Sequence, residues 1–90
     1  MRMRELVDKY IRNVEQALRE MKILEKPKLD ENDVKHVVNL ARLYLKDSDF
    51  YREHGKLRTA LASISYCEGL LDALRLLKLV EFKWPGEKGR

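Results

Sequence analysis

Residues 56–79 have the sequence KLRTALASISYCEGLLDALRLLKL and carry the most informative pattern for the fold of this chain. The apolar residues of this segment recur at steps of three and four, which places them on one face of an α-helix. This main apolar line consists of Leu57, Ala60, Leu61, Ile64, Cys67, Leu71, Leu74 and Leu77. Glu68 and Asp72 are the only charged side chains between Thr59 and Leu74. A helix that is apolar nearly all round is central in its fold or covered by a partner.

The segment before it predicts another helix. Asp30 is a suitable N-cap because its carboxylate can accept from the first free amides. The alternation of three and four continues through the polar residues around Asp47, so we expect one helix that Gly55 ends in the left-handed conformation. The alternative is a break near Asp47, since short polar side chains favour turns.

The first two dozen residues carry a second amphipathic pattern. Its apolar line consists of Met3, Val7, Tyr10, Val14, Ala17, Met21 and Leu24, flanked by Leu6, Ile11 and Leu18. Charged side chains occupy the opposite side, and the apolar stripe is broader than the seam of a two-stranded coiled coil. The pattern stops before Pro27, which has no amide donor and disfavours a helix in the residue before it.

These patterns predict an all-α, up-down-up three-helix bundle with helices at about 2–24, 30–54 and 56–79. Residues 1–80 would form one domain, with 81–90 as a C-terminal flap and frayed tail. No apolar run approaches the roughly 18 residues of a membrane span and no signal peptide is recognised, so we expect a cytoplasmic protein without membrane contact. The abundance of Lys and Glu would suit a protein from a hot environment.

One polar strip crosses the last helix and is the candidate recognition site. It consists of Ser65, Glu68, Asp72 and Arg75, which fall three or four residues apart, together with Tyr66. In a functional interpretation the two carboxylates hold a cation or an amine-bearing ligand. In a structural one they form ion pairs at the seam of the bundle, and such networks do not imply function.

Two further positions in this helix admit more than one interpretation. Gly69 lies mid-helix at a cost of about 1 kcal/mol, which close approach of another backbone would offset, either within the bundle or in a dimer. Cys67 lies on the apolar line, where we expect a buried, inert thiol.

The sequence has no metal-ligand spacing, no phosphate loop and no catalytic set, so we expect no metal, no cofactor and no enzymatic activity. An enzyme would need a second chain to complete a pocket at Glu68 and Asp72.

The excess of basic over acidic residues is unevenly distributed along the chain. The formal net charge is +4, from 19 Lys and Arg against 15 Asp and Glu. The basic excess lies in residues 1–28 and 56–90, whereas residues 29–55 are acidic on balance. A nucleic-acid-binding protein is therefore the alternative function, with candidate phosphate contacts at Arg2, Arg4, Lys26, Lys28, Lys83 and Lys88.

Residues 55–73, GKLRTALASISYCEGLLDA, resemble a small archaeal family known as domain of unknown function 357. The resemblance extends back through residues 44–51, YLKDSDFY, and its pattern matches at Tyr66, Glu68, Gly69 and Asp72, with Cys67 where alanine is more usual. The resemblance implies a compact three-helix bundle near the albumin-binding-domain-like and spectrin-like folds. It also implies a second helix that is continuous through Asp47, and it implies no activity.

Together these features predict a non-catalytic module for protein interaction or assembly. Its partner would be a second copy in a homodimer or an unidentified protein. That partner would cover the surplus apolar surface, which we expect at Leu70, Leu76, Phe82 and Trp84.

Overall fold

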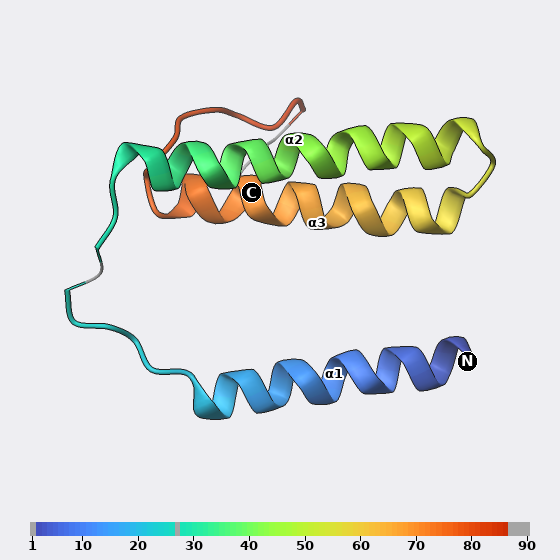
Figure 1. Ribbon diagram of the computed structural model, residues 1–90, viewed down its shortest axis with the longest axis horizontal. Coiled ribbons are helices and arrows are strands. Elements are labelled where there is room, and N and C mark those ends of the chain that lie inside the picture. The colour runs from blue at the N-terminus through green and yellow to red at the C-terminus, as the bar shows by residue number, and fades with distance from the viewer. Residues whose placement is uncertain (1, 27, 87–90) are drawn as a thin grey trace.

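A computed structural model describes residues 2–26 and 28–86, and there the chain forms helices and no strand (Figure 1). The helices are α1 (Met3–Glu20), α2 (Glu31–Glu53) and α3 (Leu57–Leu76). They alternate in direction along the chain, with α2 and α3 side by side and α1 apart from them (Figure 1). The all-α class with three helices is confirmed. None of these helices is long and apolar enough to cross a membrane.

The α2 helix has a sequence signal at each end. The Asp30 carboxylate accepts from the backbone N–H of Asp33 at 3.0 Å, and the Asp33 carboxylate accepts from that of Asp30 at 2.9 Å. These reciprocal bonds form a capping box. At the other end Gly55 has a φ of 72°, and the backbone N–H of Lys56 donates to the carbonyl of Tyr51 at 2.8 Å. The helix is continuous through Asp47, as the sequence predicts.

The seam between α2 and α3 is built from small side chains. Ala41, Ala60, Cys67 and Leu74 form the buried apolar core, and Ser48 is buried among them. The Ser48 hydroxyl donates to the carbonyl of Ala60 at 2.7 Å, and the Cys67 thiol donates to that of Ala41 at 3.1 Å. The two bonds join residues that are 12 and 26 positions apart in the sequence, and His54 is the midpoint of each pair. They fix the register of the antiparallel hairpin, and small side chains let the two backbones approach closely.

The α1 helix contacts neither α2 nor α3 in the described residues. The last helix is not central in the fold as its apolar pattern predicts, because α3 packs against α2 alone and Leu61 is 65% exposed. The radius of gyration is 15.8 Å, whereas a compact chain of this length has a radius of about 12 Å. The chain is therefore an α2–α3 hairpin with a separate first helix.

The predicted ends of two helices need correction. The α1 helix ends at Glu20 rather than near Leu24, because Met21 takes an extended backbone conformation and no tertiary contact supports a further turn. The α3 helix ends at Leu76 rather than near residue 79, because Lys78 takes a left-handed φ of 62°. There the N–H of Leu79 donates to the Leu74 carbonyl at 2.9 Å, which closes a Schellman motif.

Candidate interaction surface

The α1 helix presents an exposed apolar face. This face, called here the α1 apolar face, consists of Met3, Val7, Tyr10, Ile11, Val14, Leu18 and Met21. Each of these residues is between 47% and 64% exposed. Val7, Tyr10, Ile11 and Val14, with Glu15 at the edge, line a shallow depression of about 420 Å³. Because α1 has no neighbour in the described chain, its apolar surface is available to a partner.

A second apolar surface runs along one side of the hairpin. It contains two hollows of about 340 Å³ and 260 Å³ that share Leu45. We call this surface the hairpin groove, and the larger aliphatic side chains that line it are Val38, Leu45, Leu57, Leu61, Ile64 and Leu71. Leu45, Leu57 and Leu61 are more than half exposed. An α-helix is about 10 Å wide with its side chains, so a third helix can pack in such a groove between two helices.

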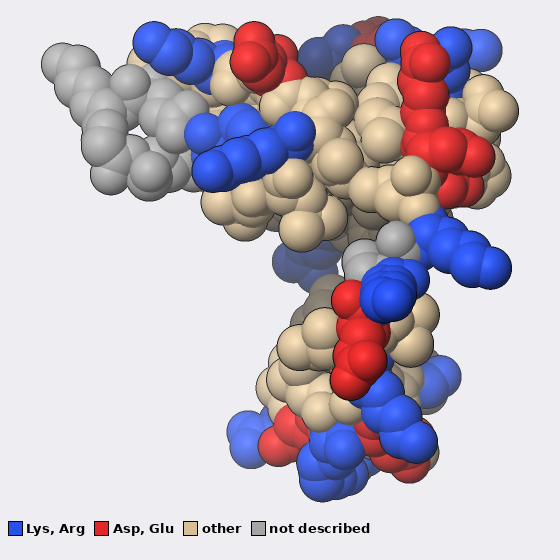
Figure 2. Space-filling model, turned by 90° about the vertical axis from the view of Figure 1, so that its left-hand side faces the viewer, with Lys and Arg blue, Asp and Glu red and all other residues tan. Residues whose placement is uncertain are grey.

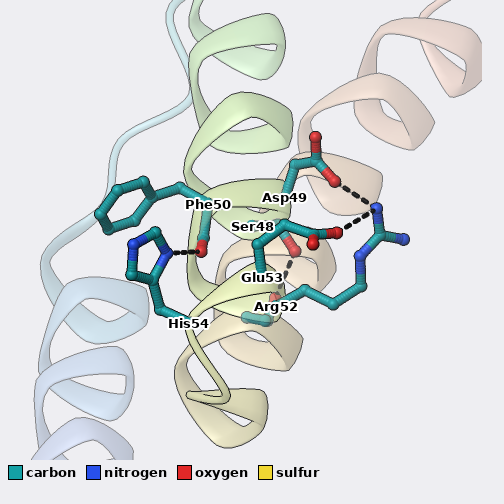
Figure 3. Close-up of polar contacts among 7 residues, drawn as sticks. Ser48, Asp49, Phe50, Arg52, Glu53 and His54 are labelled. Carbon is teal, nitrogen blue, oxygen red and sulfur yellow. Dashed lines mark hydrogen bonds and ion pairs between the residues drawn. The ribbon is translucent and has the colours of Figure 1, made fainter.

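Charged residues border the groove near the α2–α3 turn. The Arg52 guanidinium pairs with Asp49 and lies 3.6 Å from a carboxylate oxygen of Glu53 (Figure 3). The ring of His54 stacks on Phe50 with centroids 4.0 Å apart, and its Nδ1 lies 2.7 Å from the Phe50 carbonyl oxygen (Figure 3). These contacts are exposed and lie within one helix end, so they stabilise the end of α2 modestly.

The predicted polar strip divides into two parts. Asp72 and Arg75 form an ion pair at 2.9 Å, with their side chains 29% and 25% exposed. The indole N–H of Trp84 donates to the same Asp72 oxygen at 3.2 Å, and the Arg75 guanidinium lies over the Phe82 ring at 5.6 Å. These contacts hold the C-terminal flap on α3. Phe82 and Trp84 are consequently half-buried.

The other part of the strip faces solvent. Ser65 and Glu68 are exposed, and Tyr66 is half exposed with its ring centroid 4.5 Å from that of Tyr44. Glu68 follows Leu61 and Ile64 at helical spacing, so it extends the face of α3 that lines the groove. A carboxylate at this place can pair with a basic side chain of a docked partner.

Gly69 has open space around it. A Cβ atom built there would meet nothing within 4 Å. The close approach of a second backbone at Gly69 is therefore not observed in the described part of this chain. Its alternative, contact with another molecule, stays a prediction.

Cys67 is buried in the seam, as predicted, and desolvation raises the pKa of its thiol. The negative charge of Glu68 raises this pKa further. Such a thiol is a poor nucleophile. In residues 2–26 and 28–86, no three His, Cys, Asp or Glu side chains lie close enough together to hold a metal ion.

The candidate phosphate contacts do not form one surface. Arg2 and Arg4 lie at the start of α1, whereas Lys26 and Lys28 follow its other end, about 27 Å away along the helix. Lys83 lies in the flap, and Lys88 is outside the described residues. Lys and Arg are interspersed with Asp and Glu on the end of the molecule that Figure 2 shows. A duplex backbone would require a continuous basic patch.

A family model described as "Protein of unknown function (DUF357)" matches residues 9–80. The chain belongs to this family. The match covers most of α1 and all of α2 and α3, so the DUF357 unit includes the first helix as well as the hairpin. Comparisons with curated proteins and with solved structures give no match.

The exposure of the α1 apolar face is the feature that sequence reasoning missed in this DUF357 chain. The apolar stripe itself is plain in the sequence, and its breadth indicates contact with more than one helix. Periodicity shows that a face needs cover. It carries no information on which molecule provides that cover.

Proposed function

We propose that this chain is a non-catalytic module for protein interaction or assembly, and that the α1 apolar face is its binding surface. The observation that supports the proposal is an amphipathic helix that stands clear of its own hairpin with its apolar side exposed. An 18-residue helix without tertiary contacts is marginally stable in water. Docking would stabilise it, because fully burying an aliphatic side chain contributes about 1.5–3 kcal/mol and these side chains are still about half exposed.

The hairpin is the rigid part of such a module. Its buried seam and two Schellman motifs fix the groove, so it can present Leu57, Leu61 and Glu68 in a constant geometry. Cys67 is buried in the seam, and desolvation raises the pKa of its thiol. The exposed α1 apolar face and the hairpin groove support binding as the function of this chain.

Capture from an extract of the source cells tests this proposal. The chain and its Val14→Asp variant are immobilised in parallel, and we expect Val14→Asp to lose the retained proteins because it puts a charge in the centre of the α1 apolar face. Gln16→Asp is the matched control, since it introduces the same residue and charge change on the solvated side. Equal capture by the wild type, Val14→Asp and Gln16→Asp would contradict a role for this face.

A further inference from the structure

The α1 apolar face and the hairpin groove are two unpartnered surfaces that fit each other. Resting on the proposed function, we propose that the α1 helix of one copy of this chain docks in the hairpin groove of a second copy. The exchange is reciprocal, so the dimer contains two identical contacts related by a two-fold axis.

The width of the α1 apolar face points to a groove rather than to a single helix. Val7 and Val14 mark the centre of the stripe, and Ile11 and Leu18 widen it on one side. A coiled-coil pair of two α1 helices would leave these flanking side chains exposed. The hairpin groove has walls on both sides, with Leu45 on α2 and Leu61 on α3, so it can cover the full stripe.

The length and direction of α1 also match those of the hairpin helices. The α1 helix has 18 residues and is about 27 Å long, and its partners α2 and α3 have 23 and 20 residues. The start of α1 lies at the same end of the molecule as the α2–α3 turn (Figure 1). Docking in an up-down-up arrangement therefore brings Val7 and Tyr10 to the larger hollow, which Leu57 and Leu61 line.

The connection between α1 and α2 holds α1 clear of its own hairpin, so the hairpin groove is open to a second copy. Residues 21–26 and 28–30 are not helical, and Ile23 is 93% exposed. This connection leaves α1 clear of its own hairpin, which is the shape of a protomer that exchanges an element. The α1 helix carries four basic and four acidic side chains, so its docking on another copy meets no net repulsion.

The exchange would cover exposed apolar surface on both copies. Six half-exposed apolar side chains of α1, with Met21 directly after the helix, would meet the exposed leucines of one groove, and the exchange uses this contact twice. A stable interface buries about 800 Å² per partner.

Cross-linking between two single-cysteine variants tests the exchange. One variant carries Val7→Cys and the other Leu61→Cys, both with Cys67→Ala, and they are mixed, unfolded, refolded and treated with a short bis-maleimide. We expect the mixture to give a two-chain product several-fold above the amount that either variant gives alone. Replacing Val7→Cys with Arg12→Cys, on the solvated side of α1, should abolish the product.

A chain with both cysteines separates the alternatives. If it gives only an internal link at the mass of one chain, α1 docks on its own hairpin and the exchange is overturned. If no link forms and sedimentation shows a monomer, the exchange is also overturned. The proposed function is judged separately, by the capture with Val14→Asp. Should Val7→Cys or Leu61→Cys lose helical circular dichroism, Tyr10→Cys and Leu57→Cys repeat the test.

Discussion

Ser48 makes the most specific buried contact of the hairpin. Its hydroxyl donates to the Ala60 carbonyl at 2.7 Å inside the seam, so Ser48→Ala should lower the free energy of unfolding by about 1–2 kcal/mol. Urea denaturation gives this value. Ser65→Ala is the matched control, because Ser65 is an exposed helical serine and its change reports helix propensity alone. Equal effects of Ser48→Ala and Ser65→Ala would show that the buried bond contributes nothing.

The thiol of Cys67 links stability to alkaline pH. Desolvation and the charge of Glu68 raise its pKa above the ordinary value of 9.0. The folded state therefore favours the protonated thiol, and the stabilisation present below the unfolded pKa is lost as the pH rises through the folded pKa. We expect the free energy of unfolding to fall above about pH 9. This decrease in the free energy of unfolding should be smaller in Cys67→Ala. Parallel curves of the free energy of unfolding against pH for the wild type and Cys67→Ala would contradict a contribution from the thiol.

At the scale of single residues, burial was more predictable than contact partners. The position of Cys67 on the apolar line predicted its burial, because helical spacing alone determines which residues share a face. The link from Trp84 to Asp72 was not predictable. It depends on how the flap returns to α3, and no periodicity in residues 77–86 encodes that path.

The ends of α2 and α3 show how glycine and lysine differ in one backbone conformation. Gly55 and Lys78 both lie in the left-handed region, at φ values of 72° and 62°, and both follow a helix that ends in a Schellman motif. This region costs a residue with a Cβ about 1 kcal/mol or more. We expect Gly55→Ala to destabilise the hairpin by about 1 kcal/mol and Lys78→Gly to stabilise it by several tenths of a kcal/mol.

Thermal unfolding by circular dichroism measures both changes. Lys78→Ala is the control at the second site, because it removes the charge and keeps the strained conformation. A stabilisation by Lys78→Ala that equals that of Lys78→Gly would assign the effect to charge rather than to the backbone.

Helix boundaries were predictable where side chains in the sequence cap them. Asp30 and Gly55 define α2 within one residue of the prediction, and both make the expected bonds. The end of α1 was not predictable, because an uncapped helix extends only as far as its packing supports it. The end of α3 was missed since Lys78 occupies a conformation in which a sequence pattern favours glycine.

In the whole molecule, an amphipathic pattern indicates that a surface needs an apolar neighbour. It does not determine which molecule provides that neighbour. The same apolar residues of α1 fit an intramolecular bundle, an exchanged dimer and a complex with another protein. Ninety residues bury a limited fraction of their surface, so a chain of this size gains much from association. The hairpin alone leaves Leu57 and Leu61 exposed. In the exchanged dimer, α1 of the partner covers these two side chains.

Exchange makes the stability of the chain depend on its concentration. A dimer that dissociates as it unfolds gains about 2.7 kcal/mol from a hundredfold increase in concentration, which should raise the melting temperature by roughly 5–10 °C. Scanning calorimetry at two concentrations measures this shift. We expect Val14→Asp to melt at one temperature regardless of concentration, because its α1 helix no longer docks, and Gln16→Asp to behave as the wild type. A wild-type melting temperature that stays constant over this range would mean that the folded chain is a monomer, and it would contradict the exchange.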